Sequence, residues 1–168
     1  EMDYLVSHEG RNDFICNLVY SLKGNTLVLF QYVEKHGAVL HNKMMKRLGD
    51  QLHYVYGGTD VKDREEVRVL VEKANDNVIL ASYGTFSTGV NIKKIDNVVF
   101  ASPSKSRIRN LQSIGRGLRK AEGKTTMRLF DIADDLQCNN YTLKHLKERI
   151  NIYNEEGFSY EIKQFNLK

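Results

Sequence analysis

Five short runs of apolar and aromatic residues, separated mainly by helical patterns, constrain the fold of this chain more than any other feature. The runs lie at residues 26–30, 53–56, 78–81, 97–101 and 127–132. Continuous apolar runs of this length are typical of strands that are buried on both faces, as the strands of a parallel sheet are. Because strands that alternate with helices at this spacing form βαβ units, we expect an α/β fold with a mainly parallel sheet.

Helical patterns fill most of the spaces between these runs. Asn12 or Asp13 is placed to cap a first helix, and a second helix is expected at residues 39–48. Thr59 or Asp60 is placed to cap a third helix, which is charged and amphipathic. The residues that we expect on the inner side of this third helix are Val67, Leu70, Val71 and Ala74.

The chain changes in character after Asp134 and Asp135, which we interpret as surface residues or a helix cap. Residues 141–153 have helical periodicity, and residues 158–165 have the pattern of a final strand. We interpret this helix and strand as an appendage that packs on the main domain. The expected division is therefore 1–136 for the main domain and 137–168 for the extension.

The composition is that of an ordinary globular domain, with 168 residues, 41% hydrophobic and 27% charged. A net charge of +4 and a pI of about 9.0 favour an anionic partner, and nucleic acid is the commonest one. Cys16 and Cys138 form no C-x-x-C pair and the five histidines show no metal spacing, so we expect reduced thiols and no bound metal. No apolar run approaches the roughly 18 residues of a membrane span and the N-terminus is no signal peptide, so we expect a cytoplasmic protein.

The stretch from Gln112 to Arg119 carries the strongest chemical signal in the sequence. Arg116 and Arg119 are three residues apart, which places both on one face of a helix, and a guanidinium presents a planar fork of donors that suits phosphate oxygens. Residues 105–128 contain eight Lys or Arg against one acidic residue, Glu122. The alternative is a solvated basic helix, but such a helix has no need of two glycines that each cost about 1 kcal/mol relative to alanine. We therefore interpret this stretch as an edge that faces phosphate.

Polar loops follow the first four predicted strands, and the carboxyl ends of parallel strands meet at one edge of a sheet. The loop at residues 82–91 combines four hydroxyl residues with two glycines and Asn91. Hydroxyls and backbone N–H groups at a strand end suit phosphate oxygens, although an ordinary turn is the alternative. The expected edge loops are Gln31-Tyr32, Gly57-Gly58-Thr59, 82–91 and 102–106.

Taken together, these motifs resemble the second RecA-like domain of superfamily 2 helicases over roughly residues 12–135. The Q-x-x-G-R-x-x-R pattern at 112–119 resembles motif VI, Gly89-Val90-Asn91 resembles the end of motif V, and residues 27–31 resemble motif IV. Residues 55–58, followed by Asp63-Arg64-Glu65, resemble the adjoining segment of that family. Within the superfamily the chain looks most like phage UvsW-type DNA helicases, on residues 81–89, 98–103 and the short helical tail.

The resemblance implies a RecA-like three-layer fold, with helices on both faces of the sheet, and a role for each matching residue. In that family the two arginines of motif VI reach across a cleft to ATP bound on an N-terminal domain, which also holds most of the Mg²⁺ site. The implied catalytic residues are Arg116 and Arg119. The implied ATP-binding residues are Gln112, Gly115, Gly89 and Asn91. The implied nucleic-acid-binding residues are Gln31, Gly57, Arg64, Ser82 and Thr85.

The sequence lacks the G-x-x-x-x-G-K-[ST] loop that cradles ATP phosphates and the D-E-x-x pattern that holds Mg²⁺. We therefore expect a fragment of an ATP-dependent DNA helicase that acts on branched DNA in recombination, repair or replication, and we expect this fragment to be inactive alone. The alternatives are a nucleic-acid-binding module with no ATP role, the same motor domain in an RNA helicase, and a Rossmann-like enzyme. The last is weakened by the absence of G-x-G-x-x-G after the first strand.

Overall fold

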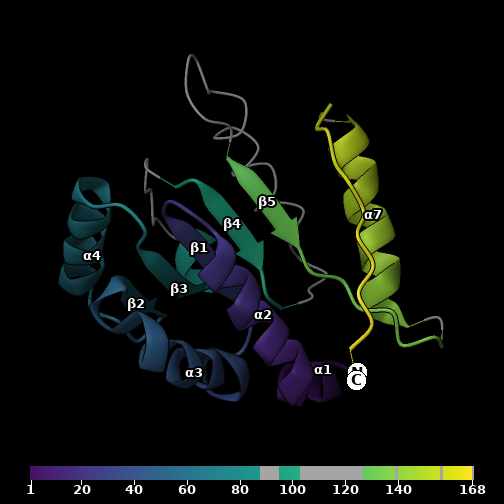
Figure 1. Ribbon diagram of the computed structural model, residues 1–168, viewed down its shortest axis with the longest axis horizontal. Coiled ribbons are helices and arrows are strands. Elements are labelled where there is room, and N and C mark those ends of the chain that lie inside the picture. Colours follow the sequence, from purple (N-terminus) through teal and green to yellow (C-terminus); the bar gives the residue numbers. More distant parts are fainter. Residues whose placement is uncertain (88–94, 103–126, 139, 156, 168) are drawn as a thin grey trace.

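A five-stranded sheet lies at the centre of the computed structural model, which describes residues 1–87, 95–102, 127–138, 140–155 and 157–167 (Figure 1). The strands pair in the order β2-β3-β1-β4-β5, and each of these pairs is parallel. The predicted α/β fold is confirmed, and each strand begins and ends within about one residue of its predicted place. The strands are β1 (Thr26–Phe30), β2 (Leu52–Val55), β3 (Val78–Ser82), β4 (Asn97–Phe100) and β5 (Arg128–Asp131).

Two helices precede the sheet, α1 (Met2–Ser7), which the sequence patterns did not predict, and α2 (Glu9–Ser21). His8 caps α2, because its ring accepts a hydrogen bond from the backbone N–H of Arg11 at 3.0 Å. The predicted cap at position 12 or 13 is wrong. Asn12 lies inside the helix, where its buried side chain donates to the carbonyl of Val6 at 2.9 Å.

A π-helical turn, η1 (Val33–Gly37), follows β1 and leads directly into α3 (Ala38–Leu48), where a helix was predicted. The turn packs closely on the sheet, since a Cβ at Gly37 would lie 2.5 Å from the buried ring of Phe30. A short 3₁₀ turn, η2 (Gly49–Gln51), then connects α3 to β2.

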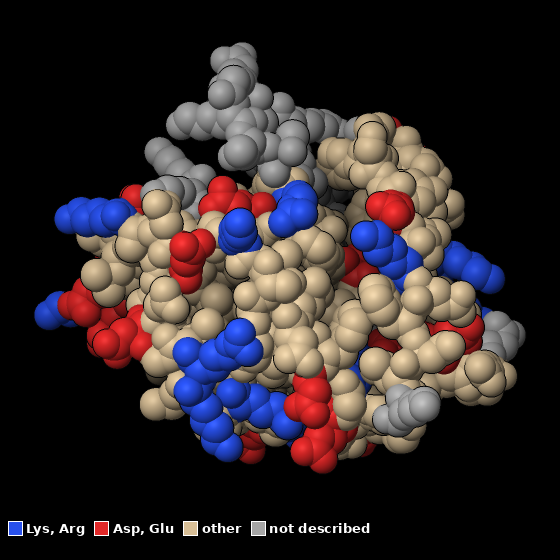
Figure 2. All heavy atoms as spheres, in the orientation of Figure 1, with Lys and Arg blue, Asp and Glu red and all other residues tan. Residues whose placement is uncertain are grey.

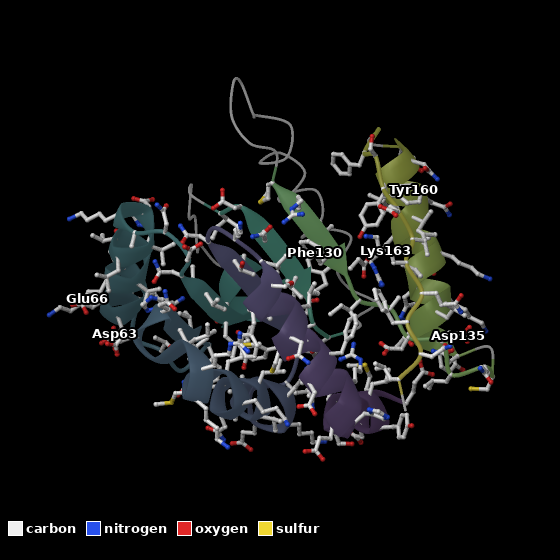
Figure 3. All side chains as sticks on the ribbon, viewed as in Figure 1. Asp63, Glu66, Phe130, Asp135, Tyr160 and Lys163 are labelled. Carbon is white, nitrogen blue, oxygen red and sulfur yellow. The ribbon has the colours of Figure 1, made fainter. Side chains whose placement is uncertain are left out.

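The charged helix is α4 (Val61–Lys73), and Asp60 caps it by accepting from the backbone N–H of Lys62. Val71 is fully buried and Val67 packs beside it, whereas Leu70 is 55% exposed and Ala74 is exposed beyond the helix end. The prediction is wrong for Leu70 because it lies about 100° around the helix from Val71. It is wrong for Ala74 because the helix ends at Lys73 and Ala74 has extended backbone. Asp63 and Glu66 extend from the outer side of α4 (Figure 3).

Helices cover both faces of the sheet, so the three-layer architecture is confirmed. In β1, Val28 and Phe30 pack against apolar residues of α2 and α3, whereas Leu27 and Leu29 pack in the cluster that contains residues of α4 and of the C-terminal helix. This alternation follows from the period of two along a strand. Both clusters are continuous because every residue of β1, β3 and β4 is buried.

The C-terminal helix is α7 (Tyr141–Glu155), as predicted, but the strand predicted at residues 158–165 is wrong. The described tail pairs with no strand and runs alongside α7, with Tyr160 and Lys163 on it (Figures 1 and 3). Its aromatic residues contact helices instead, since Tyr160 lies 6.3 Å from the ring of Tyr153 and Phe165 lies 5.1 Å from that of Phe14.

Asp134 is part of a buried ion pair, which corrects its interpretation as a surface residue or cap. The guanidinium of Arg11 is 2% exposed and binds both oxygens of Asp134, at 2.7 and 3.0 Å. Asp135 is exposed and accepts from the backbone N–H of Gln137. Among the helices described, none is long and apolar enough to cross a membrane.

Candidate functional site

The carboxyl ends of the strands bring the predicted loops to one edge of the sheet. The parallel register pairs Phe30 with Ser82, Val55 with Ala81, and Leu29 with Phe100. The segments that begin at Gln31, Tyr56, Tyr83 and Ala101 therefore leave the sheet side by side. The expectation that these loops open on one edge is confirmed for the part of each loop that the structure describes.

Gln31 is exposed at this edge, and its backbone N–H donates to the hydroxyl of Ser102 at 3.0 Å. Tyr32 is 36% exposed, and the ammonium of Lys35 lies 5.7 Å from the centre of its ring. Residues 31–35 line a shallow hollow in the surface. An amide, an aromatic ring and a cation are thus presented together beside the end of β1.

Ser102 makes several hydrogen bonds at this edge, although no predicted role includes it. Its hydroxyl lies 2.7 Å from Nδ1 of His36, and its carbonyl accepts from the hydroxyl of Tyr83 at 3.0 Å. The other ring nitrogen of His36 lies 3.0 Å from Oδ1 of Asn12. A buried polar network therefore joins the ends of β1 and β4 to the short helix after β3 and to α2.

The partners assign the tautomer of His36. Because the amide nitrogen of Asn12 donates to the carbonyl of Val6, Oδ1 of Asn12 is an acceptor and Nε2 of His36 carries the proton. Nδ1 therefore accepts from the hydroxyl of Ser102. Burial of the ring, together with the nearby charge of Arg11, lowers the pKa of His36 to about 3, so the ring stays neutral.

Ser82 and Thr85 lie in and after β3, where a short helix, α5 (Tyr83–Ser87), replaces the expected loop. Both side chains are buried, and their hydroxyls lie 2.7 Å apart. The backbone N–H of Thr85 also donates to the Ser82 hydroxyl at 3.3 Å. These bonds shape the start of α5, and a contact of either residue with nucleic acid stays a prediction.

Gly57 and Arg64 lie on the side of the edge formed by β2 and α4. Gly57 is exposed in a tight turn, which is closed by hydrogen bonds between Tyr56 and Thr59 at 2.8 and 3.0 Å. Arg64 is half-buried in the first turns of α4, and its Nε is buried with no hydrogen-bond partner among the described residues. Arg64 therefore adds a positive charge to this side of the edge.

The residues predicted to bind ATP or to act in catalysis lie outside the described residues. Gly89 and Asn91 fall within 88–94, and Gln112, Gly115, Arg116 and Arg119 fall within 103–126, as does the predicted arginine helix. The second of these segments is flanked by Ser102, two residues after the end of β4, and by Met127, directly before β5. In the described ranges, no three His, Cys, Asp or Glu side chains lie together as a metal site would require.

A second buried ion pair anchors α7 at the end of β5. The guanidinium of Arg149 binds both oxygens of Asp131, at 2.6 and 2.9 Å, and the hydroxyl of Tyr153 donates to the same carboxylate at 2.6 Å. Burial, reinforced by the charge of Asp131, raises the pKa of Tyr153. The carboxylate is thus fully engaged in holding α7 against the sheet.

Charges of both signs are interspersed over the described surface shown in Figure 2. Lys43, for example, lies 2.9 Å from Asp13 and 3.7 Å from Glu9. The concentrated positive charge of this chain is instead the run at residues 105–128 noted in the sequence.

The fold and the parallel strand-end edge define a class of protein. The family model of the helicase conserved C-terminal domain matches residues 10–121, which is about two thirds of the chain. The chain therefore belongs to the helicase C-terminal domain family, and its fold is that of a RecA-like domain.

Within this family the chain is similar to the ATP-dependent DNA helicase uvsW of Enterobacteria phage T4. The two are 34% identical over 183 residues, a match that covers 99% of this chain and 36% of that protein. A putative ATP-dependent helicase of Saccharomyces cerevisiae, IRC3, is 27% identical over 138 residues, covering 71% of this chain and 20% of that protein. The chain thus spans about a third or less of these curated relatives.

Solved structures agree with the sequence matches. The crystal structure of T4 UvsW superimposes with a TM-score of 0.80 at 34% identity, covering 99% of this chain and 37% of that one. The C-terminal domain of the DEAD-box protein Dbp5 superimposes with a TM-score of 0.68 at 13% identity, covering 89% of this chain and 82% of that one, and it shows the fold alone. The resemblance to UvsW-type helicases is confirmed.

Proposed function

We propose that this chain is the second motor domain of an ATP-dependent DNA helicase or translocase that acts on branched DNA. The observation that carries the proposal is the 34% identity to UvsW over nearly the whole chain, with the motif VI pattern of Gln112 to Arg119 intact. The parallel sheet edge, at which polar loops gather beside the positively charged Arg64, is consistent with a surface for anions. Recombination, repair or replication is the setting that we propose.

In this proposal, Arg116 and Arg119 reach ATP that is bound on an N-terminal RecA-like domain of the full-length protein. Gln112, Gly115, Gly89 and Asn91 line the same cleft. ATP is the substrate, and Mg²⁺ is assigned mainly to the N-terminal domain, since the D-E-x-x pattern that holds this ion in the family is not found in this sequence. The arginines neutralise charge on the transferring phosphoryl group, so they stabilise the transition state more than bound ATP.

The nucleic-acid track is proposed to run over Gln31, Gly57, Arg64 and the backbone around Ser82 and Thr85. The backbone is favoured at the last two positions because their hydroxyls are bonded to each other. Such contacts to phosphates carry no sequence information, so binding is expected to be independent of sequence. The two domains would close on ATP and separate again after hydrolysis. Repeated cycles would move this track along the nucleic-acid strand.

The division of the chain into a RecA-like unit at 1–136 and an extension at 137–168 is also a proposal. One buried ion pair crosses the proposed boundary, because Arg149 of α7 binds Asp131 at the end of β5. A second, between Arg11 of α2 and Asp134, lies within the RecA-like unit and fixes the chain just before the boundary. The extension is therefore expected to stay docked on the sheet.

ATP hydrolysis by the full-length protein tests the proposed function. Turnover should be stimulated by single-stranded or branched DNA and less by RNA of the same length, and the 168-residue chain alone should show none. DNA binding without any ATP turnover would favour the binding-module alternative. Stimulation by RNA and not by DNA would favour the RNA helicase alternative.

A further inference from the structure

An exposed tyrosine, Tyr32, lies at the carboxyl end of β1, and the proposed nucleic-acid track gives it no role. It directly follows Gln31, whose exposed side chain belongs to that track, and residues 31–35 line the shallow hollow at this place. Tyr32 is 36% exposed, so part of its ring is accessible to a ligand that lies over Gln31.

The backbone that carries this ring is held by hydrogen bonds. The carbonyl of Tyr32 accepts from the backbone N–H groups of His36 and Gly37, at 3.2 and 2.8 Å. The carbonyl of the next residue, Val33, accepts from the hydroxyl of Tyr54 on β2 at 3.1 Å. Because these bonds place Tyr32 before any ligand arrives, little conformational freedom is lost when its ring makes a contact.

A positive charge accompanies the ring. The ammonium of Lys35 lies 5.7 Å from the centre of the Tyr32 ring and 3.1 Å from a carboxylate oxygen of Asp3. The side chains of Lys35 and Asp3 are 64% and 79% exposed, and ion pairs between exposed side chains contribute little, so a phosphate can replace Asp3 as the partner of Lys35. An aromatic ring beside a cation suits single-stranded nucleic acid, because the ring stacks on a base while the cation attracts the strand's phosphates.

We propose that Tyr32 stacks on an unpaired base of the bound strand and that Lys35 contacts an adjoining phosphate. The inference rests on the proposed function, in which the track runs over Gln31, and it adds a base contact to the phosphate contacts of that track. Bases within a duplex are covered by their neighbours, whereas an unpaired base offers a face to the ring. Tyr32 therefore selects the single-stranded part of a branched substrate, and it does so without reading sequence, since every base has a π-face.

Two single strands of equal length separate base contacts from phosphate contacts in the full-length protein. One is oligothymidylate, and the other is an abasic strand, which keeps the phosphates and has no bases. Affinity for each is measured without ATP, and thermal unfolding of each variant is measured beside it. Tyr32→Leu removes the ring, and Tyr32→Phe retains it.

The matched control is Tyr141→Leu on α7. Tyr141 is 70% exposed, and the ammonium of Lys144 lies 5.4 Å from the centre of its ring, at the same spacing of three residues as in the pair at the end of β1. The control therefore removes an equivalent ring from a place that the proposed track does not include.

The wild type is expected to bind the abasic strand at least about tenfold more weakly than oligothymidylate. Tyr32→Leu should lose about tenfold in affinity for oligothymidylate and stay within about twofold of the wild type on the abasic strand. Tyr32→Phe and Tyr141→Leu should stay within about twofold of the wild type on both strands. Lys35→Gln should reduce the magnitude of the log–log slope of affinity against salt by about 0.7, whereas Tyr32→Leu should leave that slope unchanged.

A wild type that binds both strands equally well would overturn the stacking, whatever the stability of the variants. Equal losses of Tyr32→Leu on the two strands, or a loss in Tyr32→Phe as large as in Tyr32→Leu, would overturn it too. An unchanged salt slope in Lys35→Gln would refute its phosphate contact. With any of these results, DNA-stimulated ATP turnover by the wild type would leave the proposed function standing. A wild type that binds neither strand would refute the proposed track itself, and the stacking with it.

Discussion

Acidification from pH 7 to pH 5 is expected to destabilise the folded chain through His36. Burial lowers the pKa of His36 to about 3 in the folded chain from its ordinary value of 6.5 in the unfolded chain. Between these values the unfolded chain binds a proton that the folded chain does not, so stability is full above pH 6.5 and falls as the pH is lowered. The loss is about 1.4 kcal/mol per pH unit, or about 2 kcal/mol at pH 5.

Urea unfolding of the wild type and of His36→Asn at pH 7, 6 and 5 measures this loss. Asparagine does not titrate, so the difference in unfolding free energy between the two proteins should shrink by about 2 kcal/mol from pH 7 to pH 5. The range stops at pH 5 because Glu1 contributes to the pH dependence only at more acid pH. Desolvation raises the pKa of Glu1, but hydrogen bonds from Thr142 and Tyr141 outweigh it and lower this pKa from 4.5 to about 2 in the folded chain. A difference that stays constant to within about 0.5 kcal/mol would show that His36 is not held buried and neutral.

Three further predictions concern the packing of the domain and its charge. Arg149→Leu should cost about 3–5 kcal/mol in urea unfolding because it leaves a buried carboxylate unpaired. Arg68→Ala removes a more exposed pair on α4 and should cost much less, and equal losses for the two variants would contradict the burial argument. Gly37→Ala should cost about 1–3 kcal/mol in unfolding free energy because the added Cβ meets the ring of Phe30. Gly57→Ala has open space around it and should change the unfolding free energy by less than about 0.5 kcal/mol. A neutral Gly37→Ala would show that η1 is free to shift. The affinity of this chain for single-stranded DNA should fall with rising salt, with a log–log slope of about −0.7 per phosphate neutralised, and binding that ignores salt would count against phosphate contacts.

The fold was predictable from the sequence because its strands are buried on both faces. Continuous apolar runs such as the one at 26–30 have few other environments, and the helical patterns between them leave little choice of fold class. The tail was predicted wrongly because an apolar run does not by itself show which element it packs against. A run such as 158–165 has strand-like composition, but its apolar residues pack on helices, and only tertiary contacts decide between these outcomes.

The site was predictable only where a linear motif marks it. The arginine pair and the loops after the strands follow from spacing and from strand polarity. The roles of His36 and Ser102 do not, because the two residues are 66 positions apart and neither belongs to a local pattern. Similarly, Asp134 was interpreted as a surface residue because nothing near it in the sequence indicates its partner, Arg11.

The most direct measurement of the central claim is ATP turnover by the full-length protein with Arg116→Ala or Arg119→Ala. We predict a loss on the order of 10³-fold in kcat at saturating DNA for either change, as expected for arginines that act on the transferring phosphoryl group. Lysine should not rescue either position, because it lacks the planar fork of donors. DNA affinity and thermal stability should stay close to those of the wild type. Weakened DNA binding together with normal turnover at saturating DNA would show that these arginines bind nucleic acid and do not act on ATP.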